Sequence, residues 1–126
     1  MSIKKINYPS DIPRISLDKD WGAGMMDKGL NGKYSEPCKR ALNIANIIIN
    51  KPGLLEVAWT VAQVKRENIE PDGRIAALIL WLARGREVYT GDDGLIRAKA
   101  TVLVKPMTKL LELIERVEKA IFKANV

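Results

Sequence analysis

Hydrophobic residues recur with helical spacing through most of the chain after residue 35. From Ser35 to about Asn50, apolar positions 41, 42, 45, 48 and 49 share one face. The start Ser35-Glu-Pro supplies a capping hydroxyl, an acidic residue and a proline, which all favour the first turn of a helix. After a Lys-Pro-Gly break, a second helix is predicted from Leu54 to about Asn68, with Trp59 on its flank.

Two further helices are predicted in the second half of the chain. Residues 75–83 are apolar all round, so we expect a third helix there, started by Glu70-Pro-Asp-Gly and buried inside the body or between subunits. The last helix follows Pro106, because apolar positions 107, 110, 114, 117 and 121 repeat every three or four residues along one seam. Two i,i+4 ion pairs are predicted on this helix, Glu112–Arg116 and Glu115–Lys119.

Residues 95–105 fit two structures. Apolar residues at 96, 98, 100, 102 and 104 alternate with polar ones, which predicts a strand in a hairpin with residues 87–90 across the turn at 89–94. Positions 95, 98 and 102 also form a helical stripe, and alanines favour helix. We favour the helix and keep a short hairpin around 87–104 as the alternative. The predicted fold class is all-α, with a four- to five-helix bundle.

The first 34 residues show neither helical nor strand periodicity, because prolines at 9 and 13 and glycines at 22, 24, 29 and 32 interrupt them. We therefore predict an extended N-terminal arm over residues 1–34 and a helical domain over residues 35–126. An arm of this kind is costly to order alone, so we expect it to be ordered on a partner. The arm's aromatics could stack on single-stranded bases, but their wide spacing favours subunit contacts. The predicted subunit-contact residues are Tyr8, Trp21, Tyr34, Trp59 and Trp81.

The chain of 126 residues is one domain in size and carries a net charge of +6 with a pI near 9.6. Such a charge favours polyanionic partners, and no base-reading motif is present, so we expect salt-dependent binding to a nucleic-acid backbone. The candidate nucleic-acid-binding residues are Lys4, Lys5, Arg14, Lys33, Lys39, Arg40, Lys65, Arg66, Arg84, Arg86, Arg97 and Lys99.

Two groups among these candidates have alternative interpretations. Arg84-Gly-Arg86 ends a buried helix, where the two charges could hold a phosphate or could simply interact with the helix C-terminus. Lys39 and Arg40 lie near a helix N-terminus, where basic residues oppose the helix dipole. A bound phosphate would compensate for that placement, and solvation of the side chains would also suffice.

Catalytic, metal and cofactor chemistry is not predicted. The chain has no histidine, which is the commonest general base and a common metal ligand, and its single cysteine, Cys38, has no histidine to activate it. The adjacent carboxylates Asp92 and Asp93 lie between glycines in a turn, where aspartate is expected for backbone hydrogen bonding. The longest apolar run, residues 75–83, is too short to span a bilayer, so we expect a soluble protein without a membrane-spanning segment.

In its layout the chain resembles the major capsid proteins of filamentous and rod-shaped archaeal viruses. The resemblance rests on an extended, proline-containing basic arm, the Ser35-Glu-Pro helix start and apolar helices to residue 124. It implies double-stranded DNA in an A-like form, enclosed by paired subunits that contact it through basic positions such as Arg14, Lys39 and Arg40. Five acidic residues in the first 40 depart from this pattern and dilute the charge of the arm.

The resulting prediction is a non-enzymatic structural protein that coats double-stranded DNA and assembles, with itself or a related second subunit, into a helical filament. Its expected location is the virion, assembled in the host cytoplasm. Two alternatives remain, both cytoplasmic. One is a small helical RNA- or DNA-binding subunit of an RNA-guided effector complex, and the other is a helical protein–protein adaptor that binds no nucleic acid.

Overall fold

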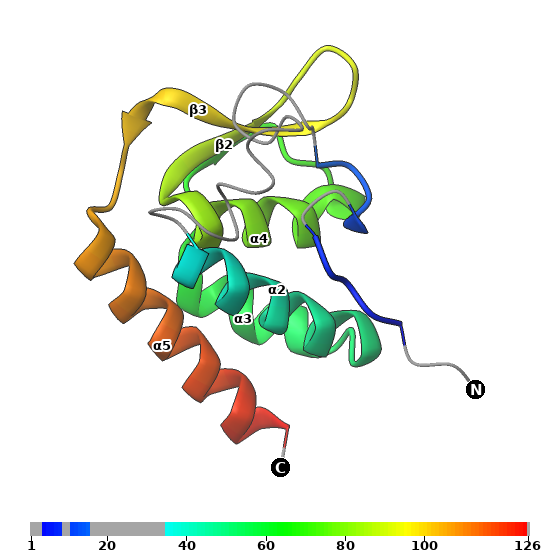
Figure 1. Cartoon of the computed structure of the whole chain (residues 1–126). Coiled ribbons are helices and arrows are strands. Elements are labelled where there is room, and N and C mark those ends of the chain that lie inside the picture. Colours follow the sequence, from blue (N-terminus) through cyan, green and yellow to red (C-terminus); the bar gives the residue numbers. More distant parts are fainter. Residues whose placement is uncertain (1–3, 9–10, 16–34, 126) are drawn as a thin grey trace.

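The computed structural model describes residues 4–8, 11–15 and 35–125. Within these residues a small sheet lies on one side of a central helix, α4, and three other helices lie on the opposite side (Figure 1). The elements, in chain order, are α2 (Ser35–Asn50), α3 (Leu54–Ala62), β1 (Arg66–Glu67), the 3₁₀ turn η2 (Pro71–Gly73), α4 (Arg74–Arg84), β2 (Arg86–Thr90), β3 (Ile96–Leu103) and α5 (Met107–Ala124).

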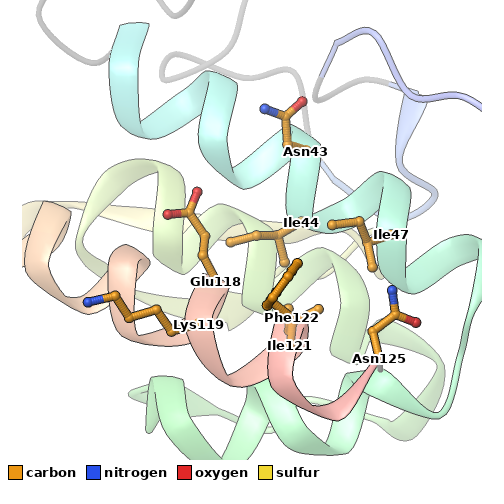
Figure 2. Close-up of a pocket in the computed structure, with 8 residues that line it drawn as sticks. All are labelled: Asn43, Ile44, Ile47, Glu118, Lys119, Ile121, Phe122 and Asn125. Atoms are coloured by element: carbon orange, nitrogen blue, oxygen red, sulfur yellow. The ribbon is translucent and has the colours of Figure 1, made fainter.

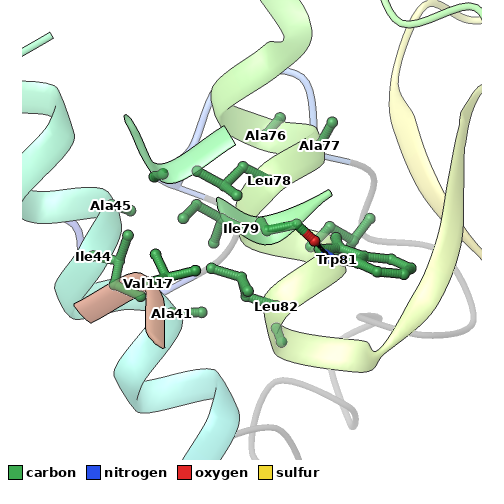
Figure 3. Close-up of a cluster of buried hydrophobic side chains, with 14 of the residues drawn as sticks. Ala41, Ile44, Ala45, Ala76, Ala77, Leu78, Ile79, Trp81, Leu82 and Val117 are labelled. Carbon is green, nitrogen blue, oxygen red and sulfur yellow. Dashed lines mark hydrogen bonds between the residues drawn. The ribbon is translucent and has the colours of Figure 1, made fainter. Parts of the chain in front are cut away.

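Helix α4 is the centre of the core. Every residue from Ala76 to Ala83 is at most 2% exposed, because α4 contacts the sheet on one side and the other helices on the other. Figure 3 shows side chains of α2 and Val117 of α5 facing Leu78, Ile79 and Leu82 of this helix. The prediction that the all-apolar helix is buried is confirmed, and the elements that cover it belong to the same chain.

The prediction of an all-α fold is wrong, because the described residues include a three-stranded mixed sheet in the order β1-β2-β3. Strands β1 and β2 run parallel, and β2 and β3 form the antiparallel hairpin that was kept as the alternative. Ile96 and Ala98 are buried while Arg97 and Lys99 are half-buried, as a strand with one covered face requires. Tertiary pairing therefore overrides the helix preference of the alanines in this segment.

Helix α3 is shorter than its sequence predicts. It ends at Ala62 because Gln63 takes a left-handed conformation (φ 49°) and its N–H bonds the carbonyl of Trp59. The chain then turns so that Arg66 and Glu67 pair with Val88 and Tyr89 of β2. The prediction of a helix to Asn68 is thus wrong beyond Ala62, since sheet pairing captures these residues.

An extended arm over residues 1–34 is not shown. Residues 4–8 and 11–15 pack against the body, where Ile6, Ile12 and Ile15 are at most 7% exposed and Ile15 bridges to Ile96 of β3. Each of these three isoleucines is buried although they have no regular spacing. A segment without hydrophobic periodicity can therefore still pack against the body. The rest of the predicted arm lies outside the described residues, and its division from the body at residue 34 stays a prediction.

Gly85 joins α4 to β2 in a conformation that a side chain would disturb. Its φ is 65°, its N–H bonds the carbonyl of Trp81, and its carbonyl accepts the N–H groups of Val104 and Lys105. A Cβ at this position would lie 3.1 Å from the carbonyl oxygen of Lys105. Gly85 therefore fixes the end of α4 and the connection between β3 and α5 at one point.

We expect Gly85→Ala to lower the free energy of unfolding by about 2 kcal/mol or more, because left-handed strain of roughly 1–2 kcal/mol adds to the close contact. Urea unfolding followed by circular dichroism measures the change. Gly94→Ala is the matched control, because Gly94 has φ 81° but no atom within 4 Å of its Cβ position. Equal losses in the two variants would show that the contact with Lys105 contributes nothing.

Candidate nucleic-acid interface

Most of the predicted cationic residues in the body are engaged by acceptors of the protein itself. Arg14 Nη1 lies 2.7 Å from Asp72 Oδ2, and Arg97 Nη2 lies 2.6 Å from Asp93 Oδ2. The other ion pairs in this set join Arg40 to Glu118 in a two-bond contact, and Lys99 to both Glu67 and Glu87. These side chains stabilise the fold locally, and binding a phosphate would compete with their carboxylate partners.

The two arginines of Arg84-Gly-Arg86 do not form a pair of exposed charges. Arg84 is 5% exposed and lies in the core near Cys38. Arg86 is half-buried and donates to the carbonyl of Ala100 in β3. Of the two interpretations, the geometry favours a structural role for this motif.

The exposed members of the predicted set fall in three places. Lys4 and Lys5 lie beside α2, and Lys39 lies on the first turns of α2. Lys65 and Arg66 follow the end of α3 and are also exposed. Lys33 lies outside the described residues. Among these places, Lys65 shares a hollow with cationic side chains that come from two other parts of the fold.

That hollow, here called the basic pocket, has a volume of about 180 Å³. Its cationic residues come from three elements: Lys65 follows α3, Lys105 lies between β3 and α5, and Arg116 is on α5. No aspartate or glutamate lines it, and none of the three cations makes an ion pair with a described residue. The remaining lining residues are Val61, Ala62, Gln63, Trp81, Val104 and Leu113.

Sequence reasoning missed Lys105 and Arg116. Arg116 was assigned to an ion pair with Glu112, but Glu112 instead contacts Lys109 at 3.6 Å. The other predicted pair, Glu115–Lys119, is present at 3.2 Å. The basic pocket joins Lys65 to cations 40 and 51 positions further along the chain, so no local pattern in the sequence could have indicated it.

The walls of the basic pocket are compatible with an anion. Trp81, buried to 1% exposure, donates from Nε1 to the carbonyl of Ala62 at 3.2 Å, and the carbonyl of Trp59 accepts the N–H of Gln63. These bonds occupy carbonyls at the C-terminal end of α3 that would otherwise repel negative charge. The dipole of α3 explains a lysine at its end, but it does not explain cations contributed by α5 and by the β3–α5 connection.

Beside the pocket, Trp59 is stacked with two arginines. The guanidinium carbons of Arg66 and Arg74 lie 4.9 and 4.7 Å from the centre of its ring, and Arg74 also lies 2.9 Å from Glu56 Oε2. The bond from Arg74 lowers the pKa of the Glu56 carboxyl. Arg66 and Lys65 line a shallow surface that Glu87 also lines, so the carboxylate offsets part of the positive charge there.

The described members of the predicted subunit-contact set lie in three different environments. Tyr8 is 42% exposed and Trp59 is half-buried under its two arginines. Trp81 is a core residue, so it has no surface through which to contact another subunit. Trp21 and Tyr34 lie outside the described residues. Tyr8 is therefore the predicted contact residue with the most exposed surface among those described.

A second surface is an apolar groove of about 490 Å³ between α2 and α5. Figure 2 shows Ile44 and Ile47 of α2 pointing toward Ile121 and Phe122 of α5. Phe122 is 75% exposed and Ile47 is 40% exposed. Charged and amide side chains form the rim: Asn43, Glu118, Lys119 and Asn125. Sequence analysis predicted one apolar seam on α5, and the exposed Phe122 lies next to Ile121 of that seam.

Cys38 is buried at the start of α2, where burial raises the pKa of its thiol from 9.0 to about 11 and the charges of Arg84 and Lys39 oppose part of the rise. As the pH passes 9, the thiol of the unfolded chain loses its proton before the folded one does. The free energy of unfolding therefore falls between pH 9 and pH 11, and at pH 10 it is lower by about 1 kcal/mol.

Urea unfolding at pH 8 and pH 10 measures this loss, and Cys38→Ala is the control because it lacks the titrating thiol. We expect the wild type to lose about 1 kcal/mol more than the variant over this interval. Equal losses in the two proteins would show that the thiol does not titrate differently in the folded chain.

Among the described residues, no group of three or more histidine, cysteine, aspartate or glutamate side chains is arranged to hold a metal ion. None of the described helices has the length and apolar character needed to cross a membrane. No protein-family model, curated protein or solved structure matches the chain.

Proposed function

We propose that the protein is a non-enzymatic structural protein that binds the phosphate backbone of double-stranded DNA through the basic pocket and assembles along it as a helical nucleoprotein filament. The observation that carries the proposal is the basic pocket, where Lys65, Lys105 and Arg116 line one hollow without a carboxylate. In the viral form of the proposal, the protein is a capsid subunit located in the virion.

The chemistry of the pocket favours a phosphate over a base. Lysine and arginine donors without a neighbouring carboxylate fit a tetrahedral oxyanion, whereas base recognition needs paired donors and acceptors. The stacked Arg66 beside Lys65 would contact a neighbouring phosphate along the same strand. Binding of this kind is independent of sequence and depends strongly on salt.

The proposal is tested by fluorescence anisotropy of a labelled 30-base-pair DNA at several salt concentrations, together with negative-stain electron microscopy. We expect affinity to fall steeply with salt, equal affinity for unrelated sequences, and filaments that form only with DNA. Single-stranded RNA of equal length serves as the competitor probe. A protein that shows no salt-dependent affinity for either polymer would contradict the proposal.

The apolar groove favours a second candidate, a protein–protein adaptor. An exposed Phe122 beside Ile44 and Ile47 offers a surface for the apolar face of a partner helix. The same binding experiment separates the two functions, because an adaptor would show no affinity for DNA. A charge at the groove in Phe122→Lys would then abolish its partner contact, whereas DNA binding under the first proposal would be retained.

A further inference from the structure

The positive charge of the basic pocket is not neutralised within it. Lys65 and Arg116 are exposed, and Lys105 is half-buried with its Nζ 6.0 Å from the centre of the Trp81 ring. An aromatic face attracts an ammonium group without cancelling its charge. Three formal positive charges therefore line one hollow in which no carboxylate offsets them.

This charge matches a phosphomonoester better than a phosphodiester. A phosphate inside a nucleic-acid strand is a diester with one negative charge, whereas a monoester carries nearly two at neutral pH because its second pKa is about 6. Coulomb attraction grows with the product of the charges, so a dianion is attracted to the same three cations roughly twice as strongly. The charge of the pocket therefore favours a ligand that the interior of a DNA strand does not supply.

The shape of the pocket favours the same ligand. Its walls come from the end of α3, the β3–α5 connection and α5, and its volume of about 180 Å³ is less than half the 440 Å³ of the hollow beside Lys4 and Lys5. Since a liquid water takes about 30 Å³, the pocket has room for one phosphate group and part of its substituent. A diester must lead a sugar out on two sides, whereas a monoester needs a single exit.

The number of donors also agrees with a monoester. Its phosphate has three terminal oxygens that accept strong hydrogen bonds, whereas a diester has two. Lys65, Lys105 and Arg116 come from three different parts of the fold, so each can bond a different oxygen. On a diester, one of the three donors would be left with an ester oxygen, which is a weaker acceptor.

We propose that the basic pocket binds a phosphomonoester dianion in preference to a phosphodiester, and that the group it holds most tightly on DNA is a terminal 5′-phosphate. The inference rests on the proposed function, because it names the preferred ligand of the same site. Backbone phosphates bind the same three donors more weakly. The end of a DNA strand is then the place at which a subunit is held most firmly.

Two small probes, methyl phosphate and dimethyl phosphate, separate a monoester from a diester. Amide chemical shifts of the full-length protein are followed by NMR while each probe is added at pH 8 and constant ionic strength. We expect methyl phosphate to bind at least about tenfold more tightly, since bonds to an additional charged oxygen support a factor of this size. Equal affinities for the two probes would overturn the proposal.

The pH dependence of binding reports on the ligand and not on the protein. The chain has no histidine, and the charged residues of the pocket are Lys65, Lys105 and Arg116, residue types that stay protonated between pH 5 and pH 8. Methyl phosphate keeps only about a tenth of its dianion at pH 5, so its affinity should fall about fivefold from pH 8. Dimethyl phosphate should bind equally at both pH values. An unchanged affinity for methyl phosphate would contradict recognition of the dianion.

Single substitutions locate the monoester site. Lys105→Gln removes one charge from the pocket and should weaken methyl phosphate binding at least about fivefold. Lys123→Gln is the matched control, because it removes an equal charge from an exposed position in the last turn of α5. Its affinity should stay within about twofold of the wild type. Equal losses in the two variants would overturn the assignment to the basic pocket.

A 12-base-pair duplex made with either 5′-phosphate or 5′-hydroxyl ends tests the assignment to DNA. The two duplexes contain the same internal phosphates, and we expect the phosphorylated one to bind at least about threefold more tightly by fluorescence anisotropy. Inorganic phosphate, the other source of the dianion, is titrated in parallel by NMR. If inorganic and methyl phosphate are preferred but the two duplexes bind equally, the assignment to strand ends is overturned.

The outcomes separate this inference from the proposed function. Salt-dependent binding of both duplexes with equal affinity for the two methyl probes would refute the monoester preference and leave the proposed function standing. A preference for methyl phosphate in a protein that binds neither duplex would refute the proposed function and the assignment to strand ends, and it would support the monoester site.

Discussion

Replacing Lys65, Lys105 and Arg116 together with glutamine is expected to weaken binding to duplex DNA roughly hundredfold at low salt, if each phosphate contact contributes about 1 kcal/mol. The dependence of log affinity on log salt concentration should become shallower by about 3, one for each lost contact. The three side chains line one pocket, so a single phosphate or two adjacent ones would lose all three donors at once. Fluorescence anisotropy titrations from 50 to 300 mM salt measure both quantities.

The matched control replaces Lys51, Lys109 and Lys123, three exposed lysines outside the basic pocket and outside the candidate set, with glutamine. Both triple variants lower the net charge from +6 to +3. We expect the control to lose affinity by about threefold or less, because its effect is only the long-range one of net charge. Equal losses would show that total charge, and not the pocket, determines binding.

The largest expected loss of stability comes from Trp81→Ala. Trp81 is 1% exposed and its indole N–H bonds the carbonyl of Ala62, so truncation leaves a cavity and an unpaired carbonyl. We expect a loss of about 3–5 kcal/mol, which is a large share of the roughly 5–15 kcal/mol typical of a single domain. Urea unfolding followed by circular dichroism measures it.

Phe122→Ala is the control for Trp81→Ala, because it truncates an aromatic residue that is 75% exposed. Its free energy of unfolding should change by less than about 0.5 kcal/mol. Trp81→Phe separates the two causes, since it keeps most of the packing but removes the N–H donor. A loss in Trp81→Ala no greater than that in Phe122→Ala would contradict the placement of Trp81 in the core.

Hydrophobic periodicity and capping residues correctly predicted the helices whose formation depends on residues close together in the sequence. The helix starting at Ser35-Glu-Pro, the buried α4 and the seam of α5 are all present, because periodic burial and capping residues determine them. Residues 96–103 and the end of α3 were predicted as helix, and both are altered by pairing with β2. Such pairing joins distant residues, so propensity alone could not decide it.

The candidate site, too, could be predicted from the sequence only in part. Basic residues are visible in a sequence, but their partners are not, and Arg14 and Arg40 are bound by the distant Asp72 and Glu118. Lys65 was identified, whereas its neighbours in the basic pocket were not, since the fold alone brings Arg116 there.

The central position of α4 has a consequence for how the protein unfolds. Both the sheet and α2 pack chiefly against this helix, whereas α3 and α5 also pack extensively against each other. The sheet and α2 should therefore lose their packing together when α4 is displaced, with similar hydrogen-exchange protection for the amides of β2 and of α2.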